Sequence, residues 1–169
     1  PLSIAPIAAG LPELVAGLSP EGGKAAAEGI MTTDTVMKEV AVEFTLGGKT
    51  CHLGGIAKGS GMIHPNMATM LVFLTTDAAI TPAMLQKALS GDIAGTFNML
   101  SIDGDTSTND TCCILASGAA CNPLIDWKSE DCDVCLGALK FVCTELAKML
   151  AGDCEGSTKL VTCTVSGSR

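Results

Sequence analysis

The chain has 169 residues, of which 47% are hydrophobic, and a formal net charge of −8. This length suits one domain with a sizeable buried core. The acidic balance argues against nucleic acid and anionic membrane surfaces as partners, because both attract basic patches. The uncharged run of residues 59–76 contains His64, Pro65 and several polar threonines, which argues against a membrane span.

One helix is predicted in the N-terminal part. The opening run of residues 1–11 is apolar but lacks a basic leader, so it does not identify a targeting signal. Ser19 followed by Pro20 is typical of a helix start, and an alanine-rich helix is expected through about Ile30. The polar residues 32–35 should lie beyond its end.

A hairpin is expected next. Apolar residues alternate with polar or small residues over positions 40–46, a period that predicts a half-buried strand. Gly47 and Gly48 form a turn signal that leads into a second strand over residues 50–53. The glycine-rich segment that follows contains Pro65, so the chain can bend tightly before Thr69.

The rest of the chain alternates between short strands and helices. Residues 70–75 form an apolar run, which predicts a strand buried on both faces. A long amphipathic helix is expected over residues 133–150, and its apolar stripe comprises Leu139, Val142, Cys143, Leu146 and Leu150. The other expected elements are a helix from Thr81, a helix over 92–99, a turn at 103–105, and strands over 112–116 and 159–165. This order predicts an α/β fold, a layered sandwich of packed β-sheets flanked by helices.

Thr69, between the glycine-rich segment and the apolar strand, is a candidate nucleophile. A threonine hydroxyl needs an adjacent base, and its own α-amine supplies one once the preceding peptide bond is broken. An α-amine has a pKa of roughly 7.7 to 8.0, so it can take and return a proton near neutral pH. The bond between Ala68 and Thr69 is therefore a candidate for self-cleavage. In the alternative interpretation, Thr69 is only the first residue of a buried strand, where β-branched residues are favoured.

Four short motifs are spread in order across nearly the whole chain: GIMTTDT at 29–35, AKGSGMIHPNMATML at 57–71, DGDTSTNDT at 103–111 and EGSTKL at 155–160. In this order they resemble four regions of the bifunctional ornithine acetyltransferase / glutamate N-acetyltransferase family of arginine biosynthesis. The regions are its upstream substrate-contact motif, its self-cleavage region, its following signature and its downstream glutamate motif. One motif alone would be weak evidence, but four in the family order form a specific signal.

The resemblance implies a ping-pong acetyl transfer. Thr69 would take the acetyl group of N2-acetyl-L-ornithine as an ester after cleavage of the bond from Ala68, and L-glutamate would then accept it. Thr32, Lys58, Thr69 and Glu155 carry over as substrate contacts. A lysine and a glutamate suit an amino-acid substrate, because they can pair with its carboxylate and its ammonium group. Without the resemblance, Lys58 and Glu155 would be interpreted as solvated charges, and Thr32 as a residue that ends a helix.

The resemblance also implies a particular fold and assembly. The fold is the self-cleaving N-terminal-threonine type of sandwich. The chain would form a single partial domain, with residues 1–68 ending the α-chain portion and residues 69–169 starting the β-chain portion of an α/β hetero-oligomer. A Thr-Gly pair that holds the oxyanion would lie before Pro1, and further substrate contacts beyond Arg169. The location would be the cytoplasm, or the mitochondrial or plastid matrix in a eukaryote.

Two other functions stay open. A related self-cleaving amidase or aminopeptidase would share Thr69 and the fold but pass the acyl group to water. A non-catalytic fragment or assembly subunit would never mature. No metal or bound cofactor is expected, because the acyl group is carried on the protein itself. Some bifunctional members of the family also take acetyl from acetyl-CoA, so this donor stays open.

Nine cysteines lie mostly in apolar segments. We interpret them as reduced thiols that act as small hydrophobic residues, which favours a reducing compartment over secretion. Cys132 and Cys135 have CxxC spacing, but no second pair follows at zinc spacing and no strand–helix redox context precedes them. His64 is a second candidate base, and with no partner evident it is interpreted as a structural loop residue.

Overall fold

A hairpin of two long strands forms one side of the sheet. In the computed structural model, which describes residues 3–63, 70–105, 107 and 109–167, β1 (Lys38–Leu46) pairs antiparallel with β2 (Lys49–Lys58). Gly47 and Gly48, with φ of 56° and 74°, make the two-residue turn, a conformation in which glycine has no Cβ clash. The predicted hairpin is confirmed, and β2 continues beyond its predicted end as far as Lys58.

Two further strands complete a mixed sheet in the order β1-β2-β3-β4. β3 (Leu71–Thr76) pairs antiparallel with β2 and parallel with β4 (Thr111–Ala116). Both strands were predicted to within one residue. The expectation that β3 is buried on both faces is wrong, because Val72 and Leu74 are buried while Thr75, on the other face, is exposed.

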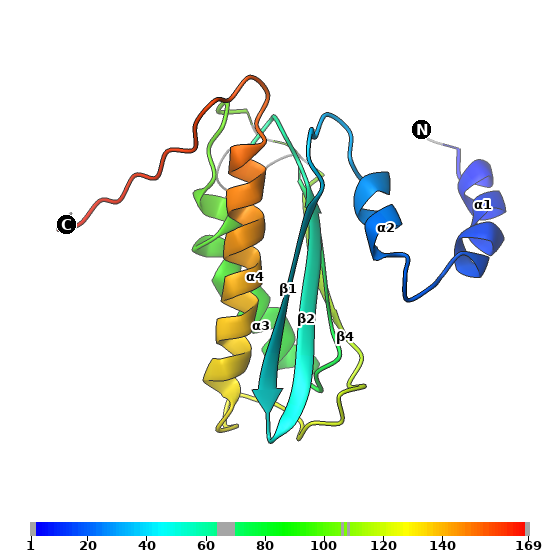
Figure 1. Cartoon of the computed structure of the whole chain (residues 1–169), viewed down its shortest axis with the longest axis vertical. Helices are drawn as coiled ribbons and strands as arrows, with labels where there is room; N and C mark the ends of the chain where they lie inside the picture. Colours follow the sequence, from blue (N-terminus) through cyan, green and yellow to red (C-terminus); the bar gives the residue numbers. More distant parts are fainter. Residues whose placement is uncertain (1–2, 64–69, 106, 108, 168–169) are drawn as a thin grey trace.

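Helices α3 (Pro82–Ala94) and α4 (Cys132–Gly152) cover one face of this sheet (Figure 1). The Thr81 hydroxyl caps α3 by accepting the Met84 N–H, so the predicted helix start is confirmed. α4 buries the whole predicted stripe, which comprises Leu139, Val142, Cys143, Leu146 and Leu150. The core therefore lies between α4 and the sheet.

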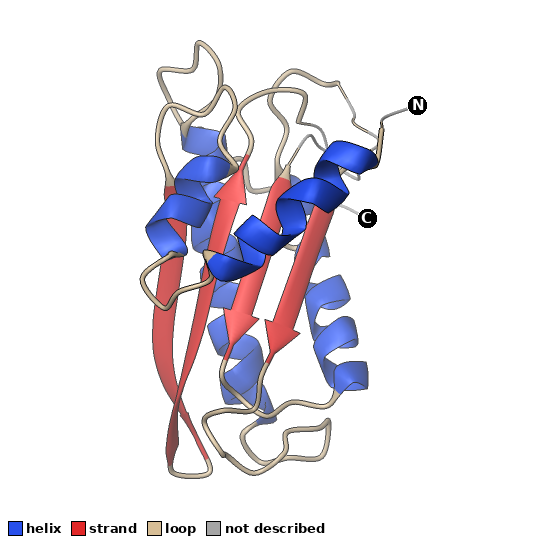
Figure 2. Ribbon diagram, turned by 90° about the vertical axis from the view of Figure 1, so that its right-hand side faces the viewer, coloured by secondary structure: helices blue, strands red, loops and turns tan. Residues whose placement is uncertain are grey.

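On the opposite side of the sheet, α2 (Gly23–Gly29) lies beside β2, and α1 (Ala5–Ala16) stands farther from the sheet (Figures 1 and 2). The sequence did not predict α1, and none of its residues is buried. The helix expected from Ser19 begins only at Gly23, because the Ser19 hydroxyl accepts the Glu21 N–H in a turn. As expected, α2 ends before Thr32.

Two other expected elements differ in the structure. The helix over 92–99 is instead the end of α3, a break at Gly95 and a short 3-10 helix, η1 (Phe97–Met99), which buries Phe97. Residues 159–165 form no strand. They extend away from the body without a partner strand among the described residues, and Val161 is 81% exposed (Figure 1).

The α/β layered class is confirmed, and the described residues supply one sheet of the expected sandwich with its flanking helices. Within the described ranges, no helix combines the length and the apolar character needed to cross a bilayer.

Candidate active site

Thr32, Lys58 and Glu155 line one open cavity of about 380 Å³, called here the Lys58 cavity. They come from three separate parts of the chain: the loop after α2, the last residue of β2 and the segment after α4. The fold thus brings together the three described residues that the sequence predicted as substrate contacts. Thr69, Ala68 and His64 lie outside the described residues.

Lys58 supplies a cation to this cavity. Its Nζ donates to the Thr32 hydroxyl at 3.2 Å, and among the described residues no carboxylate lies within ion-pair distance of it. Alternation along β2 puts the side chain on the sheet face opposite α4, where it is partly exposed. The ammonium group is therefore available to a ligand carboxylate.

Glu155 supplies an anion on the other wall. Its backbone N–H donates to the Ser60 carbonyl at 2.9 Å. A Cβ built on Gly61 would lie 3.5 Å from the Glu155 carboxyl carbon and 3.6 Å from an Asp103 carboxylate oxygen. The carboxylates of Glu155 and Asp103 therefore both lie next to Gly61, in the chain that follows β2.

Asp103 also lines the Lys58 cavity, and the sequence did not predict it as a site residue. Its carboxylate accepts the N–H groups of Met62 at 2.6 Å and Ile63 at 3.1 Å. These bonds, led by the one from Met62, lower the pKa of Asp103. Met62 has a φ of 57°, a left-handed backbone that side chains rarely adopt. The Asp-Gly turn signal located this segment, but nothing local indicated that the carboxylate would stabilise a distant loop.

A buried ion cluster lies beside the cavity and was also missed. Lys38 is fully buried, and its Nζ contacts carboxylate oxygens of Asp34 at 2.7 Å and Asp153 at 2.5 Å. Asp34 and Lys38 are four residues apart, a spacing that could have suggested a pair. Asp153 lies 115 residues away from Lys38, so only the tertiary fold could reveal it.

The start of β3 lies at the same sheet end as Lys58. In the antiparallel ladder, Lys58 is paired with Leu71. Met70, which follows Thr69 in the sequence, is buried, and its N–H donates to an Asp110 carboxylate oxygen at 3.0 Å. The Met70 carbonyl accepts the Thr111 N–H. The end of the 103–111 motif therefore anchors the first residue after the proposed nucleophile.

A larger hollow of about 690 Å³ lies elsewhere, on the open sheet face around Ala41, Thr75 and Leu115. It contains none of the predicted site residues. Its lining includes His52, whose ring nitrogen lies 2.8 Å from an Asp77 carboxylate oxygen. The predicted substrate contacts therefore line the smaller Lys58 cavity and not this hollow.

The cysteines are free thiols, and several pack in the core. Burial raises the pKa of Cys112 to about 12 and that of Cys135 to about 11. Cys132 and Cys135, the CxxC pair, are buried on the first turn of α4. Thiols with raised pKa stay protonated at neutral pH, which agrees with their interpretation as small hydrophobic residues.

Comparison with known proteins identifies a family to which this chain is similar. The model of the ArgJ family matches residues 1–169. The chain is 51% identical over 168 residues to the "Arginine biosynthesis bifunctional protein ArgJ" of Symbiobacterium thermophilum, covering 99% of this chain and 42% of the relative. It is 50% identical over 159 residues to the protein of that name from Synechococcus, covering 94% of this chain and 38% of the relative.

A crystal structure of "Arginine biosynthesis bifunctional protein argJ" from Bacillus halodurans is 44% identical to this chain, with a TM-score of 0.49. The match covers 53% of this chain and 41% of that structure. The chain thus spans about two fifths of the length of the curated relatives it matches, at 38% and 42% of the two named above.

Proposed function

Because this chain belongs to the ArgJ family, we propose that it carries the nucleophile and three substrate contacts of an acetyltransferase in arginine biosynthesis. The enzyme moves acetyl from N2-acetyl-L-ornithine to L-glutamate through an ester on Thr69. Support comes from one cavity that collects Thr32, Lys58 and Glu155 at the end of β2. The strand paired with that end begins two residues after Thr69 in sequence.

Maturation comes first. Cleavage of the Ala68–Thr69 bond frees the α-amine of Thr69, which then serves as the base for its own hydroxyl. The two pieces, 1–68 and 69–169, stay together because β2 belongs to the first and β3 to the second, and the ladder between them runs from Lys58–Leu71 to Leu53–Thr76. We therefore propose a single partial domain within an α/β hetero-oligomer.

Acetyl transfer then takes two steps. The Thr69 oxygen attacks the acetyl carbonyl carbon, the amide C–N bond breaks, and ornithine leaves with the proton that the α-amine took from the hydroxyl. The glutamate amine next attacks the ester carbon and loses a proton to the Thr69 α-amine. The ester C–O bond breaks, and the α-amine returns this proton to the Thr69 oxygen. Lys58 pairs with the substrate carboxylate, Glu155 accepts from its ammonium group, and Thr32 adds a hydroxyl.

A transfer assay tests this function. The full-length polypeptide is incubated with N2-acetyl-L-ornithine in the presence and absence of L-glutamate, and the products are identified by mass spectrometry. N-acetylglutamate that forms with ornithine in equal amounts supports transfer. Free acetate formed at the same rate with or without glutamate would indicate a hydrolase, and an intact Ala68–Thr69 bond without turnover would indicate a non-catalytic protein.

We place the enzyme in the cytoplasm, or in an organelle matrix in a eukaryote.

A further inference from the structure

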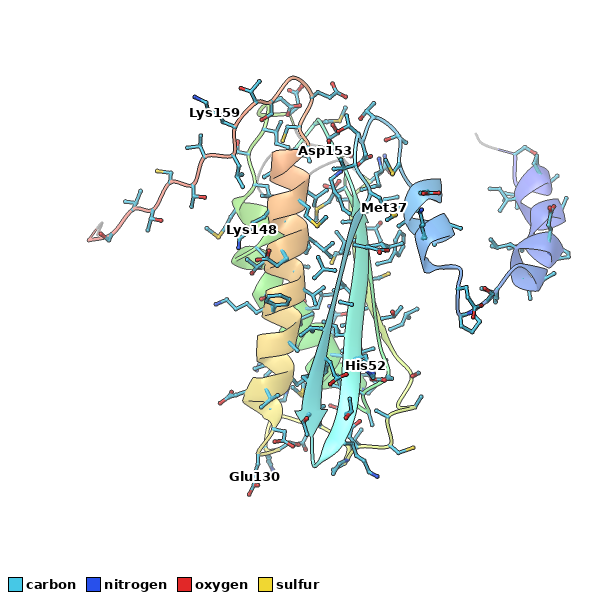
Figure 3. All side chains as sticks on the ribbon, in the orientation of Figure 1. Met37, His52, Glu130, Lys148, Asp153 and Lys159 are labelled. Carbon is cyan, nitrogen blue, oxygen red and sulfur yellow. The ribbon has the colours of Figure 1, made fainter. Side chains whose placement is uncertain are left out.

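The Lys38 cluster, defined as Lys38, Asp34 and Asp153, connects three segments of the chain, residues 32–38, 58–60 and 153–155. The buried Lys38 ammonium contacts the two carboxylates and also the Val36 carbonyl at 3.3 Å, so all three of its hydrogen-bond donors have a partner. Asp153 directly follows the last turn of α4. It lies at the same end of the molecule as Met37, the residue before β1 (Figure 3). The Asp153 carboxylate also accepts the Thr35 N–H at 2.9 Å and the Thr35 hydroxyl.

Each substrate contact in the Lys58 cavity is tied to this cluster by a short link. The Thr32 N–H donates to Asp34 at 3.2 Å. The N–H of Gly59, the residue after Lys58, donates to Asp34 at 2.7 Å.

Glu155 is linked through the backbone of Asp153, the other acidic residue of the cluster. It follows Asp153 by two residues, and the Asp153 carbonyl accepts the Ser60 hydroxyl at 2.8 Å. The Ser60 carbonyl in turn accepts the Glu155 N–H at 2.9 Å. One buried ammonium thus connects the backbone supports of all three contacts.

We propose that Lys38, Asp34 and Asp153 are positioning residues, which hold Lys58, Thr32 and Glu155 at the spacing that an amino-acid substrate requires. The proposal rests on the acetyl-transfer function above. Lys38 has no exposed surface, so it acts through its neighbours and not by touching substrate. Its two carboxylate partners leave the cluster with a net charge of −1, and burial of this charge makes the geometry depend on every hydrogen bond that the carboxylates accept.

Removing one member has different consequences for each residue. Lys38→Met would leave two buried carboxylates without a counter-ion, and the protein could fail to fold. Asp153→Asn keeps the shape and leaves Asp34 to balance Lys38, while the amide weakens the bonds from Thr35 and Lys38. Asp153→Asn therefore loosens the link to Glu155 without stranding a charge, and it is the informative variant.

The test compares Asp153→Asn with Asp133→Asn in the full-length polypeptide. Asp133 undergoes the same chemical change on the exposed first turn of the same helix, about 30 Å away at 1.5 Å per residue. We expect Asp153→Asn to raise the KM for N2-acetyl-L-ornithine at least tenfold, and Asp133→Asn to leave KM unchanged. Amide hydrogen exchange at Gly59 and Glu155 should accelerate in Asp153→Asn alone.

The outcomes separate this proposal from the proposed function. A merely stabilising cluster would lower the melting temperature of Asp153→Asn while KM and both exchange rates stayed at wild-type values, and that result would overturn the proposal. If the wild type transferred no acetyl, the function would fail, and the exchange rates would still decide whether the cluster holds the cavity. If Asp153→Asn did not fold, Thr35→Val removes one hydroxyl donor to Asp153, and a twofold to fivefold rise in KM is expected.

Discussion

Lys58, the last residue of β2, lies directly opposite Leu71, the first residue of β3. This pairing joins a proposed substrate contact to the strand that begins two residues after Thr69 in the sequence. The cation of Lys58 and the carboxylate of Glu155 lie at that same end of the sheet, on the walls of one cavity. The cavity therefore combines both charge signs that a zwitterionic amino acid presents.

Thr69→Ala should abolish both cleavage and transfer, because alanine has no hydroxyl for the acyl shift or for the ester. Denaturing mass spectrometry of the variant should show a single mass where the wild type shows two, and N-acetylglutamate should not form. Thr75→Ala is the matched control, since Thr75 is exposed on β3. Transfer that survived in Thr69→Ala would mean that another group is the nucleophile.

Lys58→Met should weaken substrate binding through the loss of a charge-assisted hydrogen bond. Such a bond contributes about 1.5–3 kcal/mol, so we expect kcat/KM to fall roughly tenfold to a hundredfold. Steady-state kinetics with both substrates measure the change. Lys49→Met removes the same charge at the other end of β2, where the residue is exposed, and should have little effect. Equal losses in the two variants would show that only overall charge matters.

Gly55→Ala should destabilise the fold, whereas Gly54→Ala should not. A Cβ at Gly55 would lie 2.4 Å from a Leu74 methyl carbon and 2.9 Å from one of Leu146, and both leucines are fully buried. At Gly54 the nearest atoms are 3.9 Å away. Overpacking costs about 1–3 kcal/mol, so urea unfolding should show that loss for Gly55→Ala alone. Similar free energies of unfolding for both variants would contradict the packing of α4 on β2.

The Lys38 cluster should make stability fall in acid. Burial opposes ionisation of Asp153, but hydrogen bonds from Lys38 and Thr35 outweigh it and lower the pKa to about 2. In the unfolded chain an aspartate has a pKa of about 3.9. A lowered folded-state pKa gives stability that is present above about pH 4 and is lost as the pH falls towards about 2.

We expect the contribution of Asp153 to be about 1–2 kcal/mol after allowance for solvent screening. The pKa of Asp34 is also lowered, in the same direction, although its burial opposes this. Urea unfolding at a series of acidic pH values should show that the free energy of unfolding falls less steeply with pH for Asp153→Asn than for the wild type. For Asp133→Asn, the free energy of unfolding should fall in parallel with that of the wild type. Parallel pH curves for all three proteins would rule out the contribution of the cluster.

Local patterns predicted most of the elements near the site. Alternation and the two glycines identified the β1–β2 hairpin, and the apolar stripe identified α4, because each of these signals lies within one contiguous stretch of sequence. The strand expected over residues 159–165 failed for the opposite reason: a strand needs a hydrogen-bonded partner, which its own residues do not supply. α1 was missed because it buries no residue, and so its apolar residues follow no buried stripe.

The residue order alone points to the proposed chemistry, through four ordered motifs, a threonine proposed to use its own α-amine as a base, and a lysine and a glutamate suited to an amino acid. Folding is what brings Thr32, Lys58 and Glu155 into one cavity beside a buried ammonium group. Local sequence could not show this, because the residues concerned are far apart along the chain. Lys38 and Asp153 are 115 residues apart, and no local pattern specifies a contact that forms only when α4 packs against the sheet.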